Sequence, residues 1–157
     1  MTEAKEPLPP DLLAERLAEV YALVGPLYRR AQRNVELSLP VAGLTVGVRA
    51  VLDLLRVNGP MTVPQMGRAQ ALSRQFVQRM VNDGAALGLV ETAPNPAHRR
   101  SSLVRLTDEG RAAITAVVAR EHALLSQVDG DLTEAEVTAC LRVLSRMLAL
   151  IDHVDLG

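Results

Sequence analysis

Two short helices separated by two residues constrain this chain more than any other feature of its sequence. Thr62 precedes the first helix, and Gln65 follows three residues later, the spacing of a reciprocal capping box. Ala71 and Leu72 form the turn into the second helix, which Ser73 is suited to cap. Two short helices so close together predict a helix-turn-helix.

The second helix of this pair has an apolar face and a polar face. Its predicted buried stripe is Val77, Met80, Val81 and Leu87. The opposite face carries Arg, Gln and Asn side chains, namely Arg74, Gln75, Gln78, Arg79 and Asn82. For Phe76 two positions stay open: packed internally, or on the outer face in contact with thymine methyl groups. Taken alone, the polar face is equally typical of an ordinary solvated helix.

A basic hairpin follows the two helices. Residues 89–93 and 102–106 are strand-like, and the eight residues between them, PNPAHRRS, are turn-forming and basic. We therefore predict a β-hairpin, called the wing here, over residues 89–106. Arg99 and Arg100 lie near its tip, where an arginine beside a reading helix can enter the minor groove of DNA. The alternative is a charged hairpin tip with no ligand.

Amphipathic helices flank this unit on both sides. From residue 11 to about 37, apolar residues recur at alternating steps of three and four, which indicates one long helix. After the wing, Thr107 and Thr133 are suited to cap two further helices with apolar stripes that run to residues 128 and 154. These stripes exceed what one small domain covers, which predicts a homodimer. The expected fold is mainly α with a small β-hairpin wing, a winged helix-turn-helix flanked by long dimerisation helices.

The composition narrows the function further. Two Tyr, one Phe and no Trp leave little for stacking platforms, so aliphatic residues must build the core, and a carbohydrate cleft or a single-strand nucleic-acid site is disfavoured. A single cysteine, Cys140, and three scattered histidines, His98, His122 and His153, predict no metal site. We expect no cofactor and no enzyme activity, because no motif pairs a nucleophile with a base. Without a signal peptide or a long apolar run, the chain is expected in the cytoplasm and not in a membrane.

Charge is distributed unevenly along the chain. Residues 64–106 contain six Arg against one Asp and one Glu, a balance of +4, whereas the remaining residues have 11 positive and 16 negative side chains, a balance of −5. A basic segment in an acidic protein favours a polyanionic partner such as double-stranded DNA.

The residues of this central segment resemble those of the MarR family of winged-helix transcriptional regulators. The resemblance is carried by GLT at 43–45, GPMTVPQMG at 59–67, SRQFVQRMV at 73–81, GLV at 88–90 and NPAHRRSSLVRLTDEG at 95–110. It implies a flexible leader at 1–10, an N-terminal dimerisation helix and connector at 11–43, a DNA-binding winged helix-turn-helix at 44–106, and C-terminal dimerisation helices at 107–157. The implied function is a dimeric, ligand-responsive repressor of a pseudo-palindromic operator.

The resemblance also implies site residues. The expected DNA contacts are Ser73, Arg74, Gln75, Phe76, Gln78, Arg79, Asn82, His98, Arg99 and Arg100. Tyr28 and Arg49 are candidates for a pocket that binds a small-molecule effector, such as an anionic aromatic compound. Arg49 lies where the family often has an aromatic residue, and its simpler interpretation is an ion pair with Asp53, one helical turn away.

Three positions depart from the family pattern. Gln70 and Gly84 replace leucines, and His98 replaces an aspartate that is thought to hold a wing arginine. A glycine inside a helix costs about 1 kcal/mol relative to alanine, so the DNA-binding unit is expected to be softer than usual. The alternative function is therefore a ligand-sensing or protein-interaction dimer that has lost sequence-specific DNA binding. Cys140, on the apolar stripe of the last helix, is expected to act as a small hydrophobic residue and not as a redox sensor.

Overall fold

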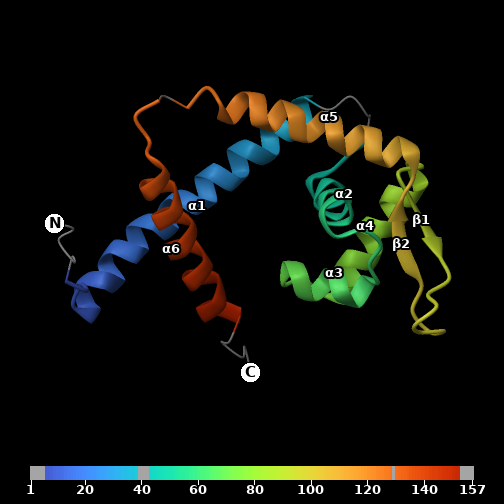
Figure 1. Ribbon diagram of the computed structural model, residues 1–157, viewed down its shortest axis with the longest axis horizontal. Helices are drawn as coiled ribbons and strands as arrows, with labels where there is room; N and C mark the ends of the chain where they lie inside the picture. The colour runs from blue at the N-terminus through green and yellow to red at the C-terminus, as the bar shows by residue number, and fades with distance from the viewer. Residues whose placement is uncertain (1–5, 39–42, 129, 153–157) are drawn as a thin grey trace. The chain divides into compact units, whose positions relative to one another are not determined.

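The computed structural model describes residues 6–38, 43–128 and 130–152, which form helices and a two-stranded antiparallel sheet (Figure 1). They belong to two structural units, Met1–Val46 and Gly47–Gly157. The first contains α1 (Pro10–Ser38), which continues as one helix through Pro26. The elements that follow are α2 (Val46–Asn58), α3 (Val63–Gln70), α4 (Arg74–Ala86), β1 (Val90–Ala93), β2 (Leu103–Leu106), α5 (Asp108–Leu125) and α6 (Glu134–Asp152). The predicted fold class, mainly helical with one β-hairpin, is confirmed.

The core of the second unit is aliphatic, as the composition predicted. On α2 the buried residues are those of the predicted stripe, Val48, Val51, Leu52 and Leu55. The other most deeply buried large side chains come from α3, α4, β2 and α5, namely Met66, Val77, Val81, Val104 and Ile114. No aromatic side chain of the described residues is fully buried. The hairpin and the helix-turn-helix therefore share one hydrophobic core.

The predicted capping interactions define the helix-turn-helix. The Thr62 hydroxyl accepts a hydrogen bond from the Gln65 amide at 3.3 Å, and the Gln65 side chain accepts one from the Thr62 amide at 2.8 Å. Helix α3 ends at Gln70, its C-cap Ala71 has a left-handed φ of 51°, and the Leu72 amide then donates to the Gly67 carbonyl at 3.0 Å. The turn between α3 and α4 is therefore tight.

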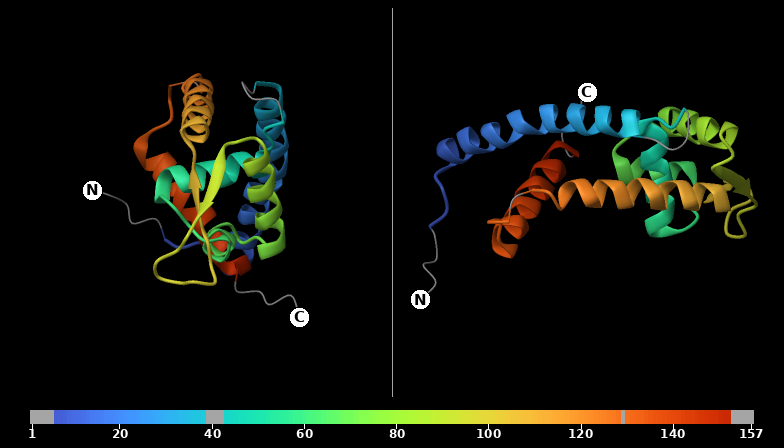
Figure 2. Two further views of the ribbon diagram at one scale, coloured as in Figure 1. Left: turned by 90° about the vertical axis from the view of Figure 1, so that its right-hand side faces the viewer. Right: turned by 90° about the horizontal axis from the view of Figure 1, so that it is seen from above.

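The wing is a short antiparallel hairpin, and a residue before α3 pairs with its second strand. Val90 is opposite Leu106 and Ala93 is opposite Leu103 in the register. Met61, just before α3, pairs with Val104 through two backbone hydrogen bonds of 2.8 and 3.1 Å. The hairpin projects from the start of α5, as a second direction of view shows (Figure 2). The Met61 pairing ties it to the start of the helix-turn-helix.

The backbone at Gly88 and Leu89 joins three elements. The Leu89 amide donates to the Gly84 carbonyl in α4 at 2.9 Å, and the Leu89 carbonyl accepts from the Thr107 amide at 3.1 Å. The Thr107 hydroxyl donates to the Gly88 carbonyl at 2.6 Å and accepts from the Gly110 amide at 3.0 Å. A Cβ atom on Gly110 would lie 1.8 Å from the Leu89 carbonyl oxygen, so α5 approaches β1 as closely as a glycine allows.

A second link joins α2 to α5. The Arg49 guanidinium donates to both carboxylate oxygens of Glu121, with a distance of 2.7 Å from Nε to Oε1, and lies 3.8 Å from Asp53. The hydrogen bond with Glu121 raises the pKa of Arg49, against the opposing effect of burial. The predicted contact with Asp53 is present but long, and Asp53 is closer to Arg56, at 2.8 Å. Arg49 therefore links α2 to α5 and is not only part of an ion pair within α2.

The C-terminal helices expose much of their predicted apolar stripes in the single chain. Helix α5 ends at Leu125, before the expected residue 128, because the amides of Gln127 and Val128 turn back to carbonyls three residues earlier. Thr133 caps α6, and its amide and hydroxyl both donate to the Glu136 carboxylate, which lowers the pKa of Glu136. The exposed apolar side chains of these helices are Leu124, Leu125, Val137, Leu141, Leu148, Leu150 and Ile151, and Val128 and Leu132 are exposed in the connection between them.

The close approach at Gly110 makes a stability prediction. Gly110→Ala should lower the free energy of unfolding by about 2 kcal/mol or more, because the added methyl group meets a backbone carbonyl that cannot move without separating α5 from β1. Gly130→Ala is the matched control, since a Cβ there has no neighbour within 4 Å. Urea unfolding followed by circular dichroism measures both, and equal stability of the two variants would contradict the proposed role of Gly110.

The Arg49 contact makes a second prediction. Arg49→Met should destabilise the fold by about 1–3 kcal/mol, because Glu121 and Asp53 lose the cation they share. Arg56→Met, which removes a more exposed arginine from the same helix, should cost less than about 1 kcal/mol. Thermal and urea unfolding of both variants provides the comparison. A loss for Arg49→Met no larger than that for Arg56→Met would mean that the α2–α5 ion pair contributes no special stability.

Candidate nucleic-acid interface

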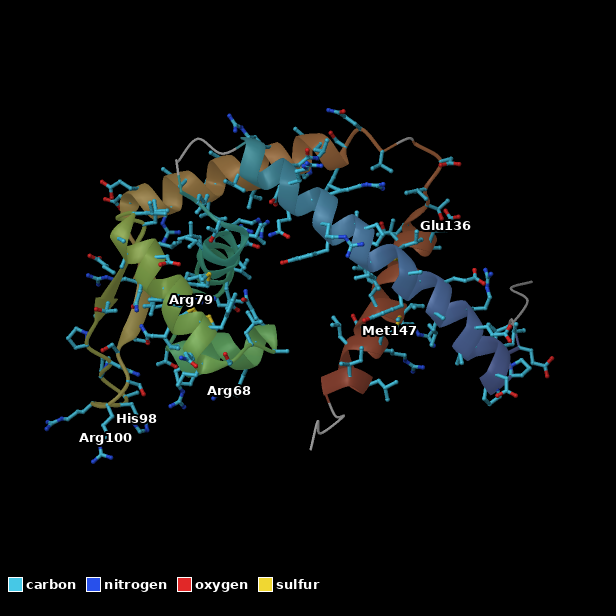
Figure 3. The ribbon with its side chains drawn as sticks, turned by 180° about the vertical axis from the view of Figure 1, so that it is seen from behind. Arg68, Arg79, His98, Arg100, Glu136 and Met147 are labelled. Carbon is cyan, nitrogen blue, oxygen red and sulfur yellow. The ribbon has the colours of Figure 1, made fainter. Side chains whose placement is uncertain are left out.

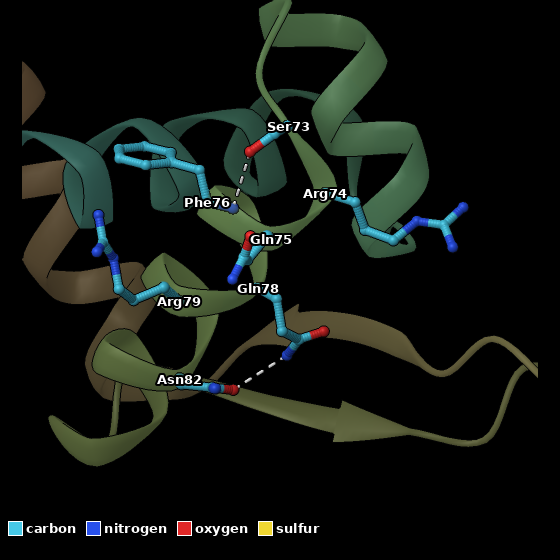
Figure 4. A pocket seen from close by; sticks show the side chains of 7 residues that line it. All are labelled: Ser73, Arg74, Gln75, Phe76, Gln78, Arg79 and Asn82. Atoms are coloured by element: carbon cyan, nitrogen blue, oxygen red, sulfur yellow. Dashed lines mark hydrogen bonds between the residues drawn. The ribbon is translucent and has the colours of Figure 1, made fainter.

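The outer face of α4 carries most of the residues that the sequence predicted for DNA contact. The Ser73 hydroxyl accepts a hydrogen bond from the Phe76 amide at 3.1 Å and so caps the helix. Val77, Met80, Val81 and Gly84 are buried, which turns the opposite face to solvent. That face borders an open hollow lined by Ser73, Arg74, Gln75, Phe76, Gln78, Arg79 and Asn82 (Figure 4). The structure therefore brings together all seven predicted residues of this helix.

Two pairs of side chains on this face contact each other. The Gln78 side-chain amide donates to the Asn82 carbonyl oxygen at 3.0 Å. The Arg79 guanidinium carbon lies 5.2 Å from the centroid of the Phe76 ring, within the range of a cation–π interaction. Phe76 is half-buried and its ring contacts Arg79 at the edge of the outer face, so its contact with thymine methyl groups stays a prediction.

The wing tip consists of two consecutive turns. The His98 amide donates to the Asn95 carbonyl and the Ser101 amide donates to the His98 carbonyl, both at 3.2 Å. His98, Arg99 and Arg100 are exposed, and Figure 3 labels two of them at the tip. Within the described residues, neither wing-tip arginine forms an ion pair. Their guanidinium groups are therefore available to a ligand.

The departures at Gln70 and Gly84 have separate structural explanations. The Gln70 side chain donates to the Ala50 carbonyl on α2 at 3.2 Å, so this amide joins α3 to α2. A Cβ on Gly84 would lie 3.3 Å from a Val90 methyl carbon and 3.5 Å from one of Val48, so the glycine permits close packing of α4. Both residues therefore have a structural role in the packing of α3 and α4, and the expected softness stays a prediction.

Helix α3 carries an exposed arginine that was not predicted from the sequence as a DNA contact. Arg68 belongs to the basic segment, is exposed, and is labelled with Arg79 in Figure 3. Its place in the first helix of a helix-turn-helix, the helix that crosses the DNA backbone, was the signal that could have identified it. It is a further candidate for phosphate contact.

The remaining predicted residues lie elsewhere. Tyr28 is exposed on α1, and Arg49 has the partners given above. Cys140 is exposed in the single chain, where the sequence analysis expected a hydrophobic contact, because its stripe on α6 is itself exposed. His122 is near the end of α5, and His153 falls outside the described residues. Among residues 6–38, 43–128 and 130–152, no cluster of potential ligands suits a metal ion, and no helix is long and apolar enough to cross a membrane.

Comparison with known proteins identifies the family. A model described as MarR family matches residues 42–101. The HTH-type transcriptional repressor NicR of Pseudomonas putida is 32% identical over 136 residues, which cover 83% of this chain and 85% of NicR. A MarR family transcription regulator of known crystal structure is 33% identical in sequence, with a TM-score of 0.73. The match covers 90% of this chain and 95% of that chain.

A third similar protein has a known regulator. BpsR of Bordetella bronchiseptica, whose DNA binding is regulated by 6-hydroxynicotinic acid, is 28% identical with a TM-score of 0.66, and the match covers 82% of this chain and 98% of that chain. Fold and family are therefore those of transcription regulators, and this chain belongs to the MarR family of winged helix-turn-helix proteins.

Proposed function

We propose that this protein is a dimeric transcriptional regulator, a ligand-responsive repressor that binds a pseudo-palindromic operator in double-stranded DNA. The observation that carries the proposal is the exposed outer face of α4, where seven side chains suited to DNA border one hollow. The wing next to it in the chain adds three exposed basic side chains, so the same segment supplies groups for both grooves.

DNA recognition follows from the chemistry of the two elements. Helix α4 is proposed to enter the major groove, where Gln78 can pair with adenine and Arg79 with guanine. Arg74, Gln75 and Asn82 complete this face, and Ser73 lies where the helix begins. His98, Arg99 and Arg100 are proposed to contact the minor groove and its phosphates. The balance of +4 over residues 64–106 supplies the electrostatic attraction.

Dimerisation is proposed from exposed apolar surface. Helix α1 exposes Leu23, Leu27 and Tyr28, and α6 exposes a stripe of aliphatic residues. Apolar surface of this extent on single helices is typical of a subunit interface. We therefore assign residues 11–43 and 107–157 to dimerisation and residues 44–106 to DNA binding, with residues 1–10 as a leader.

Ligand control is proposed from the relatives and from one charged contact. NicR is a repressor, and a hydroxylated aromatic acid regulates the DNA binding of BpsR. Tyr28 and Arg49 remain our candidates for effector contacts in this chain. Because Arg49 already holds the Glu121 carboxylate, an anionic effector would have to compete with Glu121 for the same guanidinium. Such a regulator would act in the cytoplasm.

The direct test of DNA binding is fluorescence anisotropy with labelled duplexes from the intergenic region beside the protein's own gene. We expect binding that weakens with salt and that the unlabelled site displaces better than a random duplex of equal length. Equal displacement by both competitors would favour the alternative, a ligand-sensing or protein-interaction dimer without sequence-specific DNA binding.

The wing makes a separate prediction. Arg99→Ala should weaken operator binding and reduce the slope of log K against log salt by roughly 1 per wing, or about 2 per dimer, because each wing loses one phosphate-neutralising charge. The preference for A·T-rich flanks should also shrink, since a narrow minor groove attracts arginine. Arg120→Ala removes the same charge from the exposed surface of α5 and should change neither quantity. An unchanged slope and flank preference in Arg99→Ala would confine DNA contact to α4.

The proposed dimer predicts the mass of the species in solution. Sedimentation velocity at micromolar concentration should show a species of twice the 16.9 kDa chain mass, because the exposed stripes of α1 and α6 are otherwise left in water. A single species at 16.9 kDa would contradict the dimer and the palindromic operator together.

A further inference from the structure

On the outer face of α4, Arg79 contacts the aromatic ring of Phe76 in the protein without DNA. The guanidinium carbon of Arg79 lies 5.2 Å from the Phe76 ring centroid. The two residues are three positions apart on α4, the spacing at which helical side chains are neighbours. Figure 4 shows both on one side of the helix and Arg74 on the other. An arginine side chain with many rotamers is therefore held against an aromatic ring.

Stacking of this kind leaves the hydrogen-bonding groups of Arg79 free. A guanidinium stacks through its flat face, whereas its five N–H donors lie in its plane. Within the described residues, Arg79 has no ion pair and no side-chain hydrogen bond, so these donors remain available. A planar fork of donors matches the O6 and N7 acceptors of guanine, the commonest specific arginine contact in the major groove.

Phe76 is itself anchored. Its backbone amide donates to the Ser73 hydroxyl at 3.1 Å, which fixes the first turn of α4, and its side chain is half-buried. The ring is therefore a better fixed support than a fully exposed side chain would be. Arg74, on the same helix, has neither an aromatic neighbour nor an ion pair within the described part of the chain, so only Arg79 is held in this way.

We propose that Phe76 is a positioning residue that presents Arg79 to a guanine in each operator half-site, so that the preference for this guanine depends on the aromatic ring. The inference rests on the proposed function and adds to it one base of the operator and the residue that sets its selectivity. Because the contact with Phe76 restricts the Arg79 side chain before binding, Arg79 loses less conformational entropy when the complex forms. This favours the correct base over its competitors.

The test begins with selection of binding sites from a randomised duplex library by the full-length wild-type protein. Single replacements of G·C by A·T in the selected site then identify the guanine that Arg79→Ala no longer distinguishes. For the wild type, the affinity ratio between the selected and the replaced site should be about 5- to 150-fold. This ratio is then measured for Phe76→Leu, for Phe76→Met and for each combined with Arg79→Ala.

Phe76→Leu and Phe76→Met should each lower the ratio by about two- to fivefold, the value of an exposed cation–π contact. In the Arg79→Ala background, where this ratio is already close to one, they should cause no further loss of affinity for the selected site, because Phe76 acts through Arg79. Phe76→Tyr, which keeps the ring, is the matched control and should retain the wild-type ratio. Circular dichroism and sedimentation verify that each variant remains folded and associated.

Several results would overturn the inference alone. These are an unchanged ratio in both non-aromatic variants, an equal loss of affinity for the selected site with and without Arg79, and a loss of the ratio in Phe76→Tyr as large as in Phe76→Leu. Disappearance of the Phe76→Leu effect on DNA in which deoxyuridine replaces thymidine would instead identify Phe76 as a direct methyl contact. If the wild-type protein enriches no sequence, the proposed function and this inference fail together.

Discussion

The backbone of Gly88 and Leu89 is the constraint on which the winged helix-turn-helix depends. Its amide and carbonyl groups bond to the end of α4 on one side and to Thr107, the cap of α5, on the other. Gly110 lets α5 approach so closely that no side chain fits between the helix and Leu89. Helix α4, the wing and α5 therefore meet at two residues, and a displacement of α5 acts on α4 and β1 through hydrogen bonds and not through a loop.

The Arg49 pair supplies a second attachment of α5 to the same unit. It lies between α2 and α5, whereas the Leu89 junction lies at the start of α5, so the helix is held at two separate points. Two separate attachments fix the direction of the α5 axis. In a dimer built on α5, these contacts would set the angle at which each recognition helix meets the groove, and an anion that displaced Glu121 would alter one of them.

Much of the fold could be predicted because its signals are local in the sequence. Thr62 with Gln65, Ser73, Thr107 and Thr133 each cap a helix within three residues, and the α2 stripe follows helical spacing. The contacts that were missed join residues distant in sequence. Arg49 and Glu121 are 72 positions apart, and Gln70 donates to a carbonyl 20 positions away. Helical periodicity shows that such a side chain faces inward or outward, but it does not show its partner.

In the candidate site, too, features set by local sequence could be predicted, and features set by side-chain rotamers or distant contacts could not. The polar outer face of α4 follows from helical spacing, so Arg74, Gln75, Gln78, Arg79 and Asn82 could be selected from the sequence. The stacking of Arg79 on Phe76 depends on side-chain rotamers, and the value of Gly84 depends on where β1 packs. Neither is encoded in a short pattern, which is why Phe76 stayed ambiguous and Gly84 was interpreted as a weakness.

Methylation protection of guanine N7 by dimethyl sulfate tests the central claim most directly, because N7 lies in the major groove, where α4 is proposed to bind. With the selected duplex and the full-length protein, the account predicts protected guanines in two successive major grooves on one face of the DNA, about 10–10.5 base pairs apart. Guanines that remain fully reactive in a complex that still shifts on a gel would contradict it, because the protein would then bind DNA without placing α4 in the major groove.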